Sequence, residues 1–171
     1  MTTTTLHNNR HKKFATEASL VECFVGALRS GRTRYGSVQV SREWDHKSGF
    51  VDVLARDDSQ ALLAFEAKLT DWRRAFLQAY RNAAYANRTY VLLPMQTAHR
   101  ALQAREEFEF RGIGLCAFDG KKVHVLIEAS EQEALLAWLR NRAHDFFNGL
   151  PDERRSRSSR CRDRTVPTTR V

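Results

Sequence analysis

The chain has 171 residues, of which 28 are lysine or arginine and 20 are aspartate or glutamate, so its formal net charge is +8. This length suits one domain of ordinary size, and a hydrophobic fraction of 42% can build a core, which excludes global disorder. No apolar run approaches the roughly 18 residues of a membrane span. The first residues lack the apolar segment of a secretory signal, and three scattered cysteines do not make a disulfide framework. We therefore expect a cytoplasmic protein with no membrane partner.

The positive charge is concentrated at the two ends of the chain. Residues 1–13 carry +3 and residues 151–171 carry +4, whereas residues 14–150 carry only +1. Both ends lack an apolar period, and the second is rich in arginine and serine, which is typical of disorder. We interpret both ends as disordered basic segments that flank one folded domain. They are either solubility tails or tethers that hold nucleic acid non-specifically by releasing counterions.

Hydrophobic periodicity predicts alternating helices and strands across the domain. In chain order we expect a helix at 14–30, strands at 36–45, 49–56 and 61–69, a helix at 71–87, a strand at 89–94, a helix at 97–110, strands at 113–118 and 122–128, and a helix at 131–147. Thr70 is the expected N-cap of the second helix, and Ser130 with Glu133 forms the expected capping box of the last. This order predicts an α/β domain with a central mixed sheet flanked by helices.

Charged residues interrupt two of the predicted apolar strands. Asp52 lies within FVDVL, and Glu66 and Lys68 lie within LLAFEAKL. Strand alternation places Glu66 and Lys68 on the same face. Burying unpaired charge costs several kcal/mol, so these side chains need partners or an ion. Two carboxylates and a lysine converging on a cation would meet that need. The alternative is an ordinary cross-strand ion pair with a nearby arginine, with Asp52 at a strand edge.

A third carboxylate belongs to the first predicted helix. At helical spacing Glu17 continues the apolar line of Val21, Phe24 and Leu28, which faces the sheet, whereas Glu22 falls on the solvated side. A glutamate at the edge of a buried stripe is unusual. We therefore expect Glu17 to join Asp52 and Glu66.

This arrangement resembles a known superfamily. Asp52, followed after thirteen residues by Glu66-Ala67-Lys68, resembles the D-x(n)-E-x-K signature of the PD-(D/E)XK, or restriction-endonuclease-like, nucleases, although Val51 stands where that pattern often has proline. Residues 17–24 (EASLVECF) resemble the first-helix element of Holliday-junction resolvases and Mrr-type enzymes. The resemblance covers about residues 14–128 and implies a restriction-endonuclease-like core.

The resemblance also implies a metal-dependent phosphodiesterase. Asp52, Glu66 and the backbone carbonyl of Ala67 would bind Mg²⁺, with Mn²⁺ as a substitute, because oxygen ligands suit such hard cations. Glu17 would bind the metal directly or through water. Lys68 would orient or deprotonate the attacking water and offset charge in the transition state.

The second predicted helix carries a polar stripe with three arginines. Its members are Arg74, Gln78, Arg81, Tyr85 and Arg88. Gln78 resembles the helix-borne glutamine that many superfamily members place beside the metal. Arg74 and Arg81 are candidates for phosphate contacts, or the stripe is an ordinary solvated basic face.

The expected partner is nucleic acid, DNA above all, and the expected reaction is hydrolysis of its phosphodiester bonds. Many members of the superfamily dimerise to cut two strands, so the resemblance also suggests a homodimer. The alternative function is a non-catalytic nucleic-acid-binding or assembly module with the same fold.

Overall fold

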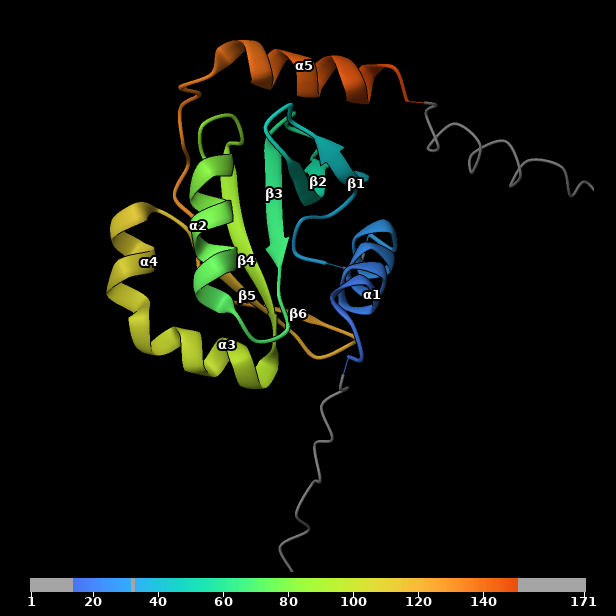
Figure 1. The fold of residues 1–171 in the computed structure, drawn as a ribbon. Coiled ribbons are helices and arrows are strands. Elements are labelled where there is room, and N and C mark those ends of the chain that lie inside the picture. Colours follow the sequence, from blue (N-terminus) through green and yellow to red (C-terminus); the bar gives the residue numbers. More distant parts are fainter. Residues whose placement is uncertain (1–13, 32, 151–171) are drawn as a thin grey trace, which may run out of the picture.

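The structure is a computed structural model that describes residues 14–31 and 33–150. The two ends expected to be disordered, 1–13 and 151–171, lie outside the described residues. The described chain forms one mixed β-sheet flanked by helices (Figure 1). This confirms the α/β architecture expected from the sequence. No helix in the described part of the chain is both long and apolar enough to cross a membrane.

The sheet follows the order of its strands along the chain. Its members are β1 (Gln39–Asp45), β2 (Phe50–Arg56), β3 (Leu62–Ala67), β4 (Arg88–Pro94), β5 (Gly114–Phe118) and β6 (Val123–Ile127). The outer pairs β1–β2, β2–β3 and β5–β6 are antiparallel, whereas β3–β4 and β4–β5 are parallel. Parallel neighbours need crossover connections, and helices supply both of them.

The helices cover both faces of the sheet. They are α1 (Glu17–Arg29), α2 (Trp72–Asn82), α3 (Met95–Ala101), a 3₁₀ turn (Leu102–Ala104), α4 (Arg105–Arg111) and α5 (Ala137–Asn148). The buried side of α1 packs on one face, where Phe24 meets Phe65 of β3. On the other face α2 packs Phe76 against Phe108 of α4, and α5 covers the β1–β3 end.

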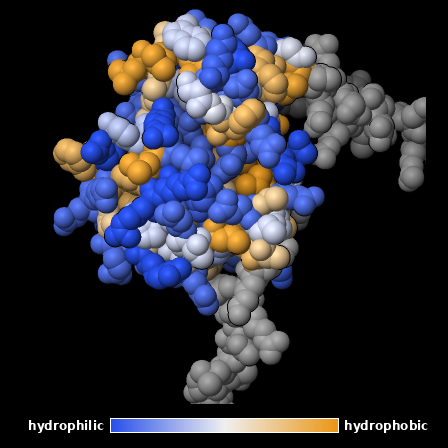
Figure 2. All heavy atoms as spheres, viewed as in Figure 1, coloured by the Kyte–Doolittle hydropathy of each residue, from blue (hydrophilic) through white to orange (hydrophobic). Residues whose placement is uncertain are grey.

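The exposed surface around α2 is largely polar. Figure 2, in the same view as Figure 1, shows a mostly hydrophilic face on which apolar residues form separate small patches. Exposed apolar residues include Leu77, Tyr80, Phe110 and Trp138. This view therefore offers no broad apolar docking surface.

The ends of α2 differ from the prediction. Its N-cap is Asp71, which accepts the N–H of Arg74 at 3.1 Å, and not Thr70. The helix ends at Asn82, five residues before the expected end at 87. Beyond it Tyr85 is buried, with 1% of its surface exposed. The Tyr85 ring packs against β1 and α5, and a longer α2 would not place it there.

Two later helices also differ from the prediction. The single helix expected at 97–110 is divided into α3, the 3₁₀ turn and α4. The last helix starts at Ala137, not at 131, and the capping box of Ser130 and Glu133 does not form. Instead the N–H of Gln132 donates to the carbonyl of Asn87 at 2.7 Å. Hydrogen bonds to a distant loop thus replace a local helical start.

Candidate active site

The site forms where β2 and β3 separate. Their antiparallel ladder runs as far as the pair Val53–Phe65. Beyond this pair, Asp52 Oδ2 accepts the N–H of Ala67 at 2.8 Å. A carboxylate thus takes the place of a ladder carbonyl. This bond fixes Asp52 beside the end of β3 while the two backbones move apart.

The ammonium of Lys68 joins three segments at this point. Its Nζ lies 3.2 Å from Glu17 Oε2 on α1 and 3.7 Å from Asp52 Oδ2 on β2. It also donates to the carbonyl of Ala67 at 2.8 Å. The Lys68 side chain is 12% exposed, compared with 30% for Asp52 and 48% for Glu17. The structure therefore brings together three residues that the sequence marked as site candidates.

The direction of Lys68 is set by its partners and not by strand alternation. Alternation predicts that it shares the face of Glu66, but β3 ends at Ala67. Its ammonium pairs with Glu17 of α1, which packs on the face opposite α2. Lys68 thus lies at the end of the strand, between the two faces.

Glu66 is the most buried acid of the group, with 1% of its surface exposed. Its Oε1 accepts a hydrogen bond of 2.6 Å from Asn82 Nδ2, and its Oε2 has no hydrogen-bond partner among the described residues. Burial, followed by the nearby charge of Asp52, raises the pKa of Glu66 to about 8. Glu66 is therefore mostly protonated at neutral pH unless a cation stabilises its charge. No arginine pairs with it in the described chain, so the simple ion-pair alternative does not account for this residue.

Asn82 was not identified from the sequence. It follows Ala75 and Ala79 at helical spacing on the buried side of α2, and it is 2% exposed. Its Oδ1 in turn accepts the hydroxyl of Tyr85 at 3.2 Å. The available signal was a polar residue on an otherwise apolar helix face.

The remaining candidates lie on or after α2. Gln78 is on this helix, and its Oε1 is buried without a hydrogen-bond partner among the described residues. Arg74 and Arg81 are exposed on the same helix. The predicted stripe does not continue to Tyr85 and Arg88, since the first is buried after the helix end and the second opens β4. The candidates for contacts with substrate on α2 are thus Arg74, Gln78 and Arg81.

The oxygen atoms of the site suit a hard divalent cation. The carboxylates of Asp52 and Glu66 and the carbonyl of Ala67 are ligand types that Mg²⁺ prefers, and a cation would satisfy the unpartnered Oε2 of Glu66. Within residues 14–31 and 33–150, no three His, Cys, Asp or Glu side chains form a ready cation site. Mg²⁺ commonly uses one or two carboxylates and completes its shell with water or phosphate. The donor types therefore suit this ion with two protein carboxylates, although the ammonium of Lys68 donates to the Ala67 carbonyl in this structure.

Comparisons with known proteins address the fold. No family model and no curated protein matches the chain. A protein of unknown function from Silicibacter pomeroyi matches with a TM-score of 0.56 and 16% identity, over 85% of this chain and 92% of that one. A repair endonuclease from Pyrococcus abyssi aligns with a TM-score of 0.44 and 15% identity, over 64% of this chain and 50% of that one. The likeness to the Silicibacter protein concerns the fold alone.

Proposed function

We propose that the chain is a Mg²⁺-dependent nuclease of the restriction-endonuclease-like type that hydrolyses phosphodiester bonds in DNA. The observation that supports this most directly is the meeting of Glu17, Asp52 and Lys68 from three separate elements. It is strengthened by the buried carboxyl of Glu66, one oxygen of which has no hydrogen-bond partner in the part of the chain that the structure describes. Burying charged groups costs desolvation free energy, and titratable residues buried together in this way are typical of functional sites.

In this proposal the acids hold the metal. Asp52, Glu66 and the carbonyl of Ala67 bind Mg²⁺ or Mn²⁺, and Glu17 acts through water or through Lys68. When bound, the metal polarises the scissile phosphate and lowers the pKa of a water molecule. Asp52 already accepts the N–H of Ala67, so its carboxylate is oriented before any ligand arrives.

Lys68 has the second role. Its ammonium carries three hydrogen-bond donors, and Glu17 and Asp52 hold it at the end of β3. There it orients the attacking water and offsets the negative charge that develops on the phosphate. Gln78, Arg74 and Arg81 on α2 contact the substrate backbone, and a homodimer would present two such sites to two strands.

The decisive experiment is a cleavage assay on labelled single-stranded, duplex and branched DNA and on RNA, in Mg²⁺, in Mn²⁺ and in EDTA. The wild-type protein is expected to cut DNA only with metal. Asp52→Asn is expected to abolish cutting while the circular dichroism spectrum and DNA affinity persist. Asp145→Asn, an exposed acid on α5, is the matched control. Full cleavage by Asp52→Asn, or none by the wild type on any substrate, contradicts the proposal.

A second candidate is a nucleic-acid-binding module without catalysis. It is favoured by the position of the Lys68 ammonium. This group donates to the Ala67 carbonyl and pairs with Glu17 and Asp52, so it already supplies a positive charge where the metal is proposed to bind. An internal cation of this kind can serve a purely structural role. This candidate predicts salt-dependent DNA binding with no cleavage in either metal, and binding that Lys68→Met leaves unchanged.

A further inference from the structure

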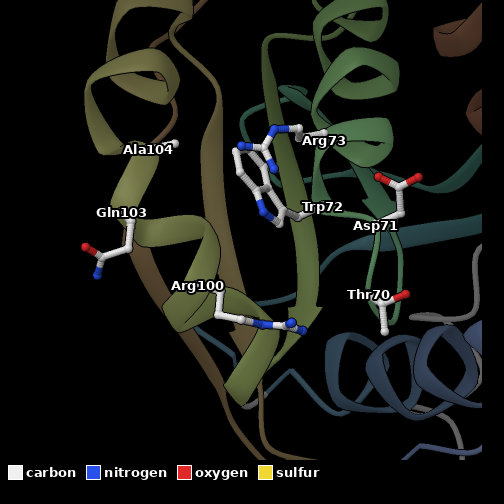
Figure 3. A pocket seen from close by; sticks show the side chains of 7 residues that line it. All are labelled: Thr70, Asp71, Trp72, Arg73, Arg100, Gln103 and Ala104. Carbon is white, nitrogen blue, oxygen red and sulfur yellow. The ribbon is translucent and has the colours of Figure 1, made fainter.

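A hollow of about 500 Å³ opens between the start of α2 and the α3–3₁₀ turn (Figure 3). Its lining includes Thr70, Trp72 and Arg73 from one side and Arg100 and Gln103 from the other. Thr70 is two residues from Lys68, so their Cα atoms are at most about 7 Å apart. The edge of the hollow formed by Thr70 therefore lies near the backbone of Lys68, and none of the lining residues takes part in the roles proposed above.

Arg73 is held in place by stacking. Its guanidinium lies 4.4 Å from the centre of the Trp72 ring, and Figure 3 shows the two groups face to face. The indole in turn packs against Phe108, with ring centres 5.8 Å apart. A stacked guanidinium keeps its in-plane N–H groups available for hydrogen bonds. Arg73 is thus an exposed cation oriented by the indole, and among the described residues its N–H groups have no hydrogen-bond partner.

Arg100 is tied to the segment that carries Lys68. Its Nη2 donates to Thr97 Oγ1 at 3.2 Å, and the Thr97 hydroxyl donates to the carbonyl of Leu69 at 2.6 Å. Leu69 directly follows Lys68. The position of Arg100 is therefore coupled through two hydrogen bonds to the backbone beside the site.

The hollow contains two arginines and one aspartate, so its lining keeps a net positive charge. In the described chain, no acid lies within ion-pair distance of Arg73 or Arg100. Asp71 also lines the hollow. Its carboxylate caps α2 by accepting the N–H of Arg74, and in Figure 3 it points away from Trp72. Two cations with spare donors therefore favour an anionic ligand with several oxygen acceptors.

We propose that this hollow is a phosphate subsite for the nucleic-acid substrate. Arg73 and Arg100 hold a phosphodiester next to the one presented to Lys68, and Gln103 donates at the rim. This inference rests on the proposed nuclease function, since it says where the neighbouring phosphate of the DNA strand binds when one phosphate lies at Lys68. It places the strand across the start of α2.

The test measures DNA binding without requiring cleavage. Fluorescence anisotropy of a labelled duplex is recorded in EDTA over a range of salt concentrations, with the full chain. Variants are Arg73→Gln, Arg100→Gln and the double variant, and the control is Arg42→Gln, an exposed arginine on the edge strand β1. Each lost phosphate contact lowers the slope of log K against log salt by about 0.9. The double variant is expected to lose about 1.8, and the control is expected to keep the wild-type slope.

The outcomes separate the subsite from the nuclease. A slope for the double variant equal to that of Arg42→Gln overturns the subsite, even where the wild type cuts DNA. A wild type that binds but never cuts contradicts the nuclease, and the slopes then still decide the subsite. A wild type that shows no salt-dependent binding overturns both. Arg73→Lys adds a second check, because a lysine keeps the charge but loses the planar stack, and intermediate affinity is expected.

Discussion

Asn82 donates a 2.6 Å hydrogen bond to one carboxyl oxygen of Glu66, and the other oxygen has no hydrogen-bond partner among the described residues. The pair joins the end of α2 to the end of β3, with Glu66 1% exposed and Asn82 2% exposed. Because a carboxyl group is planar, the hydrogen bond to Oε1 also fixes the position of Oε2. Asn82 is therefore a positioning residue for the candidate metal ligand.

Replacing Asn82 with alanine is expected to destabilise the fold. The substitution removes the 2.6 Å hydrogen bond to Glu66 Oε1, and leaving a buried acceptor unsatisfied costs about 1–3 kcal/mol. Urea denaturation at pH 7 measures the loss. Asn141→Ala, on the exposed surface of α5, is the control and should change stability by less than about 0.5 kcal/mol. Equal effects of the two substitutions would contradict the role given to Asn82.

The raised pKa of Glu66 predicts that stability falls as the pH rises from about 4.5 to about 8. The folded protein holds the proton up to a pKa of about 8, whereas the usual value is 4.5. The stabilising contribution of this group is thus complete below about pH 4.5 and is lost as the pH rises through about 8, at up to about 1.4 kcal/mol per pH unit. Urea denaturation in EDTA between pH 5 and pH 9 measures the slope.

Glu66→Gln supplies the control for this pH dependence. Glutamine keeps a carbonyl oxygen for Asn82 and cannot ionise. The variant is expected to have a flatter profile and to exceed the stability of the wild type at pH 9. A variant slope as steep as that of the wild type would show that another group titrates in this range.

The sequence predicted which elements carry three of the candidate site residues. Asp52 and Glu66 were identified because they interrupt apolar strands, and Glu17 because it continues an apolar helix line. Those patterns depend on local periodicity, which the structure keeps in α1, β2 and β3. The contact of Glu17 with Lys68 does not follow from this periodicity, because β3 ends at Ala67 and Lys68 turns toward α1.

The parts that the sequence did not predict depend on distant contacts. The early end of α2 and the late start of α5 are set by the burial of Tyr85 and by the bond from Gln132 to Asn87. Neither has a local signal. Asn82 did carry a local signal, a polar residue on an apolar helix face, but its contact with Glu66 arises only when α2 packs on the sheet.

Gln78 allows function to be separated from stability. Its Oε1 is buried without a hydrogen-bond partner among the described residues. Gln78→Met removes this unsatisfied atom and keeps the side-chain length, so stability is expected to stay equal or to rise slightly. If Gln78 contacts the substrate or the metal, DNA cleavage falls by about tenfold or more, which corresponds to one lost hydrogen bond of about 1.4 kcal/mol. Unchanged cleavage would remove Gln78 from the site.

Glu17 offers the sharpest comparison, because the chain provides a matched acid on the same helix. Glu17 Oε2 lies 3.2 Å from Lys68 Nζ, but the Glu17 side chain is 48% exposed. A half-exposed ion pair contributes about 0–1 kcal/mol to stability. Glu17→Gln is therefore expected to shift the unfolding midpoint little while it lowers the rate of cleavage and the apparent affinity for Mg²⁺.

Glu22→Gln is the control for Glu17→Gln. Glu22 is exposed on the same helix, α1, and its substitution removes the same charge. Titration of cleavage against Mg²⁺ and urea denaturation are run on both variants. A site role for Glu17 requires that only its variant moves the Mg²⁺ midpoint, because only Glu17 touches Lys68. If both variants move it equally, the effect comes from the net charge of α1, and Glu17 is a surface acid that happens to lie beside a lysine.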